Sequence, residues 1–274
     1  MKAVSRALRA PVVSNRSAGP GHYLITLEAP EVAALSRPGQ FCMLRPQPES
    51  TDPLLGRPLA VFDADTSRGR VSFLYLPVGR GTRLLARKKP AEEVYLNGPL
   101  GRAFTPPGKA AAVGVAGGTG VAGVRFLLAT ARRAGLPAFL FLGARTARLL
   151  LPPEHLSFDG ECVLATDDGS LGEKGTVLDA LGRRLREGTL PAGARYYVAG
   201  PLPMMRQAAR LAAGRGLWME VSLEARMGCG LGACRGCMVP ARTPHRLYGF
   251  MQRAVCQDGP VFSPEEIDWE RLPR

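Results

Sequence analysis

The sequence predicts a multi-domain protein in which an antiparallel β-barrel precedes an α/β domain with a parallel sheet and a small C-terminal module. Three observations predict it. Short strand-like runs fill the first hundred residues, strands alternate with helices after about residue 105, and four of the six cysteines lie from Cys229 onward. The 274 residues, 46% of them hydrophobic, are enough for two or three domains. We expect the boundaries 1–105, 106–217 and 218–274.

The first part is expected to form the barrel. Its short runs are rich in β-branched or aromatic residues, and Gly and Pro separate them at regular intervals. Such spacing is typical of an antiparallel barrel. The expected strands are 22–28, 40–44, 58–63, 70–76 and 93–97.

The pattern changes after the Thr-Pro-Pro-Gly segment 105–108, which we interpret as a linker. Continuous apolar runs, typical of buried parallel strands, then alternate with helical stretches. This alternation indicates an open parallel α/β sheet. The expected strands are 110–116, 138–142, 161–166 and 195–199, and the expected helices end near 133 or span 176–186 and 203–214.

Charge and hydropathy exclude two classes of protein. The net charge is +13, but only five of the 36 basic residues are lysine, and the arginines are scattered along the chain. No basic patch with interleaved aromatic residues is present, so we expect no nucleic-acid partner. The longest nearly apolar run, 110–124, is too short and too rich in glycine to cross a membrane. No apolar segment follows the charged N-terminus, so we expect a cytoplasmic protein without a signal peptide.

The cysteines carry the most specific signal. Cys42 and Cys162 stand alone in apolar segments, and we interpret them as buried core residues. The other four have the spacing C-x4-C-x2-C, then 18 residues, then C, which is the plant-type arrangement for a 2Fe–2S cluster. Glycines around them suit a loop that wraps a compact cluster. A structural zinc site is the alternative, although zinc usually takes two separate ligand pairs. The cluster ligands expected are Cys229, Cys234, Cys237 and Cys256.

Two segments of the barrel suggest a pyrophosphate site. Arg-Pro-Leu-Ala (57–60) begins an expected strand, and Gly-Arg-Gly-Thr (79–82) follows the next one. Arginine can pair with a pyrophosphate, and a Gly-Thr turn can supply a backbone N–H and a hydroxyl. The simpler interpretation is an ordinary strand start and a hairpin turn.

Two further segments suggest a nucleotide site in the α/β domain. Gly-Gly-Thr-Gly (117–120) lies between a buried strand and a helix, where such sheets bind pyrophosphate. Gly-Pro-Leu-Pro-Met-Met (200–205) also follows a strand and precedes a helix. Each is also compatible with a plain strand-to-helix turn.

Together, these motifs resemble the electron-transfer subunit of NAD-dependent (class 1B) dihydroorotate dehydrogenase, within the ferredoxin-reductase superfamily. The resemblance covers nearly the whole chain and keeps the motif order. RPLA resembles the family's Arg-Pro-x-Ser flavin motif and GRGT its Gly-x-Gly-Thr. The most specific stretches are SLEARMGCGLGACRGC (222–237) and VCQDGPVF (255–262). One departure is Ala60, where the motif usually has Ser or Thr, so no side-chain hydroxyl is available to the flavin there.

The resemblance implies the cofactors FAD, 2Fe–2S and NAD and an enzymatic role that needs a second subunit. A partner chain containing FMN would oxidise dihydroorotate in pyrimidine (UMP) biosynthesis, and electrons would pass through the cluster and FAD to NAD. We expect a heterotetramer of two plus two chains, with no dihydroorotate oxidation by this chain alone and no catalytic residue of its own. The implied FAD residues are Arg57, Pro58, Leu59, Ala60, Leu74, Tyr75, Leu76, Gly81 and Thr82, and the implied NAD residues are Gly117, Gly118, Thr119, Gly120, Gly200 and Met204.

Other functions remain open on the sequence. A subunit of a related NAD(P)H:ferredoxin oxidoreductase or of a sulfide dehydrogenase would share the same motifs. A metal-binding module that only docks a partner is the alternative from another class, and the flavin-type motifs disfavour it. NAD and NADP are not distinguished, because Arg145 suits either a 2′-phosphate or a helix turn. We interpret His22, His155 and His245 as structural or surface residues.

Overall fold

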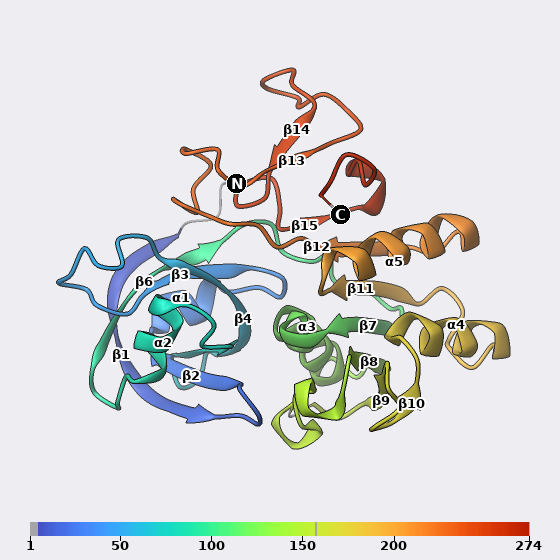
Figure 1. Ribbon diagram of the computed structural model, residues 1–274, viewed down its shortest axis with the longest axis horizontal. Helices are drawn as coiled ribbons and strands as arrows, with labels where there is room; N and C mark the ends of the chain where they lie inside the picture. The colour runs from blue at the N-terminus through green and yellow to red at the C-terminus, as the bar shows by residue number, and fades with distance from the viewer. Residues whose placement is uncertain (1–4, 157, 274) are drawn as a thin grey trace.

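The structure, a computed structural model, describes residues 5–156 and 158–273. Its N-terminal part is a closed antiparallel barrel with the strand order β1-β2-β5-β4-β3-β6 (Figure 1). This confirms the expected barrel. The strands are β1 (Arg6–Ser17), β2 (Tyr23–Glu28), β3 (Phe41–Arg45), β4 (Arg57–Asp65), β5 (Arg70–Tyr75) and β6 (Glu93–Leu100).

Alternation of apolar and polar residues explains why the barrel closes around its own core. In β5, Val71 and Phe73 are fully buried, whereas Ser72 between them is only partly buried. The hydroxyls of Ser72 and Thr26 on the neighbouring strand β2 lie 2.9 Å apart. Successive side chains of a strand point to opposite faces, so one face fills the barrel and the other meets solvent or the next domain.

Three elements of the barrel were not expected from the sequence. The long strand β1 joins β2 and β6 and thereby closes the barrel, with a bulge between Val12 and Ser14. Two short helices, α1 (Pro30–Leu35) and α2 (Arg80–Ala86), connect strands. The expected turn at 79–82 is therefore wrong in detail, because Gly79 is the N-cap of α2. The hydroxyl of Thr82 accepts the Gly79 N–H at 3.0 Å and fixes this helix start.

The middle part is an open seven-stranded sheet with the order β10-β9-β8-β7-β11-β12-β15, parallel except for the edge strand β15. Its elements confirm the expected alternation. The strands are β7 (Ala112–Gly117), β8 (Ala138–Ala144), β9 (Glu161–Thr166), β10 (Glu173–Lys174), β11 (Arg195–Ala199), β12 (Met219–Ser222) and β15 (Val261–Phe262). The helices are α3 (Val121–Arg133), α4 (Val177–Glu187) and α5 (Leu202–Arg215), with 3-10 turns at Gly118–Gly120, Ala147–Leu149, Pro153–His155 and Pro264–Glu266.

The sheet runs across the boundary that we expected at 217/218. Both β12 and β15 come from the range 218–274, and β12 pairs in parallel with β11. The segment 105–108, interpreted as a linker, is anchored to the same strands. The Thr105 N–H and hydroxyl donate to the buried Glu220 carboxylate at 2.8 and 2.7 Å, and the Tyr197 hydroxyl donates to the Thr105 carbonyl at 2.9 Å. The barrel is thus fixed to the sheet.

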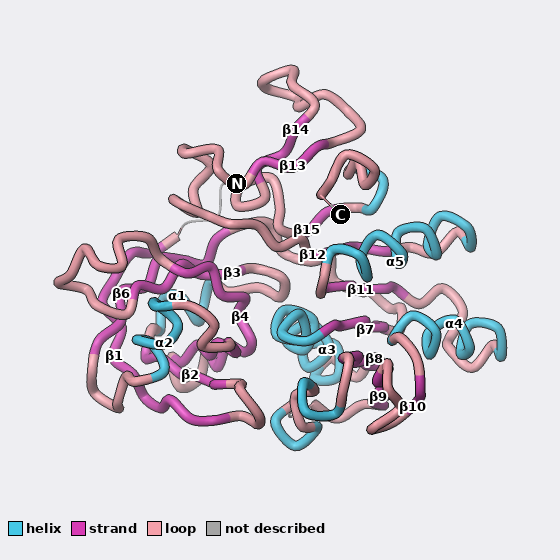
Figure 2. Tube along the Cα trace, viewed as in Figure 1, coloured by secondary structure: helices cyan, strands magenta, loops and turns pink. Residues whose placement is uncertain are grey.

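The remaining C-terminal residues form mostly loops, with one two-stranded ribbon of β13 (Met238–Pro240) and β14 (Gln252–Ala254) (Figure 2). These loops lie above both larger domains in Figure 1. Gly230 packs so closely on the barrel that an added Cβ would lie 2.7 Å from Cγ of Met43. The cluster loop therefore contacts the barrel directly.

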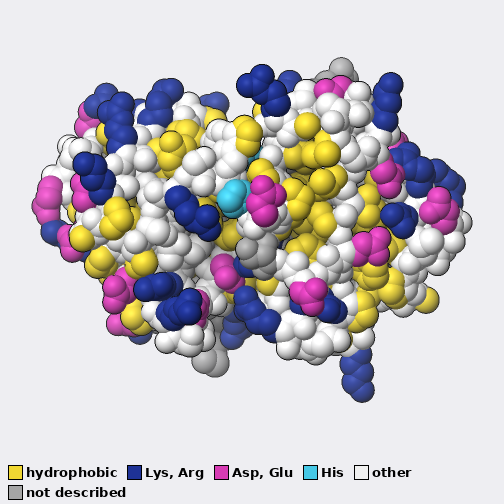
Figure 3. Space-filling model, turned by 90° about the horizontal axis from the view of Figure 1, so that it is seen from below, with side chains coloured by type: hydrophobic (Ala, Val, Ile, Leu, Met, Phe, Trp, Pro, Cys, Tyr) yellow, Lys and Arg dark blue, Asp and Glu magenta, His cyan; other side chains and the backbone are white. Residues whose placement is uncertain are grey.

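The surface agrees with the scattered arginines of the sequence. Figure 3 shows hydrophobic side chains where the two halves of the molecule meet, with Lys and Arg side chains spread over both halves. None of the helices in residues 5–156 and 158–273 has the length and apolar character of a membrane span.

Candidate cluster, flavin and nucleotide sites

The four cysteines predicted to bind the cluster come together at the edge of the C-terminal module. The sulfurs of Cys237 and Cys256 lie 3.3 Å apart. Cys229 and Cys234 form a second pair, in which the Cys234 backbone N–H donates to the Cys229 sulfur. The Gly232 N–H, in the loop between Cys229 and Cys234, donates to the Cys256 sulfur at 3.1 Å and so joins the two pairs. Two pairs of thiols fit a two-iron cluster, in which each iron takes two protein sulfurs.

Backbone N–H groups surround these sulfurs. Leu231 and Cys234 donate to the Cys229 sulfur at 3.3 and 3.4 Å, and Gly236 donates to the Cys234 sulfur at 3.5 Å. Burial alone would raise the pKa of the Cys229 thiol, but these N–H groups outweigh burial and lower the pKa to about 7. The backbone N–H groups thus favour thiolate at Cys229, the form that binds metal, whereas burial and the neighbouring Cys237 raise the pKa of Cys256 to about 12.

The loop backbone adopts the unusual conformations that a wrapped cluster requires. Gly230 and Gly232 have φ of +73° and +81°, and Arg235 also has a positive φ of +55°. Within the described ranges, no three His, Cys, Asp or Glu side chains surround a site for one metal ion. Burial also raises the pKa of the two isolated cysteine thiols, that of Cys162 to about 11. Cys42 is buried in the core as expected, whereas Cys162 is only partly buried and packs against the core.

A second feature is a cavity of about 430 Å³ between the barrel and the sheet. Eight of the nine predicted flavin residues line it, together with Thr119 and Gly120 of the predicted nucleotide loop. The structure therefore brings the two motif sets to one place. The eight are Arg57, Pro58, Leu59, Ala60, Leu74, Tyr75, Leu76 and Thr82.

The ninth predicted flavin residue, Gly81, supports the Arg57 side chain. A Cβ added to Gly81 would lie 2.0 Å from both Cζ and Nε of Arg57, so the guanidinium packs on the bare helix start of α2. Arg57 also donates to the Leu55 carbonyl. Burial lowers the pKa of Arg57, and the half-buried cation faces a cavity suited to an anion. These contacts explain why the Arg-Pro and Gly-x-Gly-Thr segments occur together.

The two predicted nucleotide loops meet at the carboxyl ends of β7 and β11, which are neighbours in the sheet. A Cβ on Gly120 would lie 2.3 Å from the Ala199 carbonyl oxygen, and one on Gly200 would lie 2.7 Å from Cε of Met204. A Cβ on Gly117 would likewise lie 2.7 Å from Cδ of Pro201. Glycine is thus required where these loops cross. Gly117, Gly118, Gly200 and Met204 lie outside the cavity lining.

Several cavity residues were not predicted. Ser222 is the last residue of β12, Glu224 and Met227 follow that strand, and all three line the cavity. Cys229 is only two residues beyond Met227. Burial by the surrounding wall raises the pKa of the Glu224 carboxyl, although its side chain is exposed to the cavity. All three belong to the stretch 222–237 that carries the family resemblance, but that stretch was used only to predict the cluster cysteines.

Comparison with known proteins agrees with this geometry. Residues 224–268 match the family model for the iron-sulfur cluster binding domain of dihydroorotate dehydrogenase B. The chain is 38% identical to the dihydroorotate dehydrogenase B (NAD(+)) electron transfer subunit of Desulforamulus reducens, over 97% of this chain and 100% of that protein. It is 36% identical to the corresponding subunit of Geobacillus kaustophilus, over 94% of this chain and 97% of that protein.

Solved structures show the same fold. An NADH-dependent reduced ferredoxin-NADP oxidoreductase matches with a TM-score of 0.81 and 28% identity, over 96% of this chain and 91% of that chain. A ferredoxin reductase of carbazole 1,9a-dioxygenase matches with a TM-score of 0.67 and 26% identity, over 78% of this chain and 67% of that chain. The identity and coverage of the curated relatives show that this chain belongs to the family of electron transfer subunits of NAD-dependent dihydroorotate dehydrogenase B.

Proposed function

We propose that this chain passes electrons from a catalytic partner subunit to NAD⁺ in the dihydroorotate dehydrogenase reaction of pyrimidine biosynthesis. One observation carries the proposal: the cavity is lined by flavin-motif residues, nucleotide-loop residues and Met227, two residues before Cys229. The three expected sites therefore adjoin. FAD accepts one or two electrons and so joins a one-electron cluster to a two-electron nicotinamide.

Each part of the cavity has a separate task in this proposal. Arg57 and Thr82 would hold the pyrophosphate of FAD on the barrel wall, and Thr119 and Gly120 would face the bound NAD. Ala60 offers no hydroxyl, so only the backbone can hydrogen bond the flavin at that position. The division 1–105, 106–217 and 218–274 assigns one cofactor to each part, with β12 and β15 shared between the last two.

The partner would be a dihydroorotate dehydrogenase chain that contains FMN, in a complex of two plus two chains. The family membership supports a catalytic partner, since the relatives are named as electron transfer subunits. We also propose a cytoplasmic location. The six cysteines form no disulfide in the structure, and unpaired cysteines suit a reducing compartment.

The cluster module offers a surface for this partner, which we call the cluster face. It comprises Leu231, Leu247, Tyr248 and Met251, with exposed fractions of 53, 81, 52 and 40%. The sequence makes Met227, Leu231 and Met238 candidate apolar contacts for a partner near the cluster, and of these three only Leu231 is exposed. Met227 lines the cavity, and Met238 packs against the core.

The charges around the cluster face indicate the chemistry of the partner. Residues 225–256 contain five arginines and no Asp or Glu. The Arg235 guanidinium stacks on Tyr248 and Phe250 at 4.9 Å from each ring centroid, which holds the hairpin next to the cluster loop. We therefore propose a partner surface with an apolar centre and an acidic rim, because complementary charge steers association.

The experiment is co-expression of this chain with the dihydroorotate dehydrogenase chain of the same genome. We expect a stable complex in which dihydroorotate reduces NAD⁺. The isolated chain should pass electrons from NADH to an artificial acceptor without oxidising dihydroorotate. If the isolated chain oxidises dihydroorotate, or if the two chains never associate, a related ferredoxin or sulfide oxidoreductase is the better assignment.

The cluster face is tested by substitution in the same complex. Leu247→Glu places a charge at the proposed apolar centre and should weaken association by about tenfold or more, as loss of a central apolar contact does. Leu149→Glu is the matched control, because Leu149 is an exposed leucine of the middle domain. Equal weakening by both variants, or by neither, would place the partner elsewhere.

A further inference from the structure

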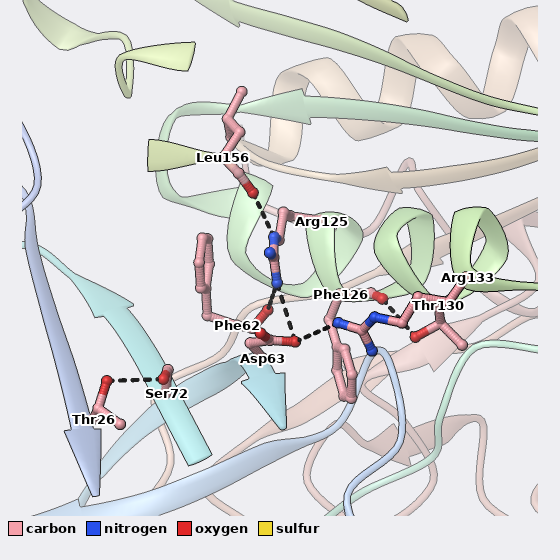
Figure 4. Close-up of polar contacts among 9 residues, drawn as sticks. All are labelled: Thr26, Phe62, Asp63, Ser72, Arg125, Phe126, Thr130, Arg133 and Leu156. Carbon is pink, nitrogen blue, oxygen red and sulfur yellow. Dashed lines mark hydrogen bonds and ion pairs between the residues drawn. The ribbon is translucent and has the colours of Figure 1, made fainter. Parts of the chain in front are cut away.

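A buried arginine joins the barrel to the middle domain next to the cavity. Arg125 lies on α3 and is 4% exposed. Its Nε donates to the Leu156 carbonyl at 2.5 Å, and its Nη1 donates to the Phe62 carbonyl at 3.4 Å and to Oδ1 of Asp63 at 3.1 Å. Figure 4 shows the guanidinium between Leu156 on one side and Phe62 and Asp63 on the other. One side chain therefore ties together α3, β4 and the loop before β9.

Further contacts hold the same group in place. The Arg125 guanidinium lies over the Phe62 ring, 4.8 Å from its centroid. Asp63 also accepts from Arg133, which lies about two turns further along α3, at 3.1 Å. The Asp63 side chain is 30% exposed, that of Arg133 is 59% exposed and that of Arg125 is 5% exposed. The ion pair of Asp63 with Arg125 is therefore more buried than its ion pair with Arg133. A buried guanidinium needs such partners, because an unpaired buried charge is strongly destabilising.

This contact lies close to the cavity on both of its elements. Ala60 of β4 and Gly123 of α3 both line the cavity. A Cβ on Gly123 would meet the Cβ of Ala60 at 3.8 Å, so the two elements face each other there. Phe62 lies two residues after Ala60 on β4, and Arg125 lies two residues after Gly123 on α3. At about 3.3 Å per strand residue, the Arg125 contact is within about 10 Å of the facing walls.

We infer that Arg125, paired with Asp63, is a positioning residue that sets the α3 wall of the cavity against the β4 wall. The inference rests on the proposed function, since these walls would carry nicotinamide and flavin. The flavin motif lies on β4 and the nucleotide loop leads directly into α3. A displacement between the elements would separate the two bound groups while leaving each site intact. Displacements of about 1 Å can cost a hundredfold in rate.

The test compares Arg125→Met with Arg133→Met in the cofactor-loaded protein. Methionine retains much of the aliphatic volume but removes the charge and the hydrogen bonds. We expect Arg125→Met to retain FAD, iron and thermal stability sufficient for purification. NADH should reduce its flavin at least about tenfold more slowly, and hydrogen exchange should rise in β4 and α3. Arg133→Met should resemble the wild type, because exposed ion pairs contribute little.

Two further variants keep the test decisive. Asp63→Asn removes the charge of a partly exposed residue while it retains the shape of the side chain, and it should also slow flavin reduction. This variant therefore serves as the test if Arg125→Met fails to fold. Arg125→Lys restores the charge and should recover part of the rate. Unchanged reduction and exchange in Arg125→Met and Asp63→Asn would overturn the inference. Loss of FAD from Arg125→Met in parallel with the rate would also overturn it, by showing a general structural role. If NADH does not reduce the flavin of the wild type, the proposed function itself fails.

Discussion

The contact between Gly81 and Arg57 allows a sharp test of the flavin site. In Gly81→Ala, the new Cβ would lie 2.0 Å from Cζ and Nε of Arg57 and 2.5 Å from Nη2. Carbon atoms prefer a separation of about 3.5–4.0 Å, so the guanidinium must move by at least about 1.5 Å. The clashing group is the end of a flexible side chain, so the fold can accommodate the methyl group while Arg57 loses its place.

The expected cost follows from the bond that Arg57 would lose. A hydrogen bond to a charged group contributes about 1.5–3 kcal/mol. FAD affinity should therefore fall by about tenfold to a hundredfold. Alanine is a better helix former than glycine by about 1 kcal/mol, so the stability of the flavin-free protein should be kept or increased.

The assay is titration of the flavin-free chain with FAD, together with thermal unfolding. Gly79→Ala is the matched control, because a Cβ there meets nothing within 4 Å. Arg57→Ala should show the same loss of affinity as Gly81→Ala. If Gly81→Ala binds FAD as tightly as the wild type, Arg57 does not hold the pyrophosphate and the flavin site is misplaced.

The wild type should contain about two iron atoms per chain, and Cys256→Ala should lose them. Elemental analysis that finds zinc instead of iron in the wild type would contradict the cluster. Gly230→Ala combines a φ of +73° with a Cβ 2.7 Å from Cγ of Met43, so the cluster should be lost faster on dilution with chelator. Burial lowers the pKa of His22, so the unfolded chain binds more protons below about pH 6.5 and stability falls there. His22→Asn should flatten that part of the denaturant-measured pH profile, and an unchanged slope would count against it.

The sequence predicted best where chemistry or continuous burial constrains it. The strands 161–166 and 195–199 agree with β9 and β11 because buried parallel strands are apolar on both faces. It failed at β1, whose residues RALRAPVVSNRS include three arginines and a proline. Such a strand forms because β2 and β6 pair with it on both sides, and that requirement is invisible in its own composition.

The tail shows a different limit. Residues 218–274 were expected to form a separate small module, yet β12 and β15 join the middle sheet. A four-residue and a two-residue strand give too short a pattern to recognise. Their place is set by neighbours that are distant in the sequence. The same strand pairing places Ser222, Glu224 and Met227 at the cavity. These cavity residues were therefore missed for the same reason as the strands β12 and β15.

Arg125 illustrates why the relation between the domains was beyond prediction. Five of the 36 basic residues are lysine, so the chain has 31 arginines. Most of them stand in sequence patterns typical of solvent-exposed cations. On α3 the sequence VAGVRFLLATARR shows Arg125 as one polar residue amid an apolar run. Burying a polar side chain on a helix costs free energy unless another group hydrogen bonds or pairs with it. That partner, Asp63, lies on a strand of another domain. A buried arginine inside an apolar helix segment therefore indicates a domain contact, and its partner is to be sought among the acidic residues near the flavin strand.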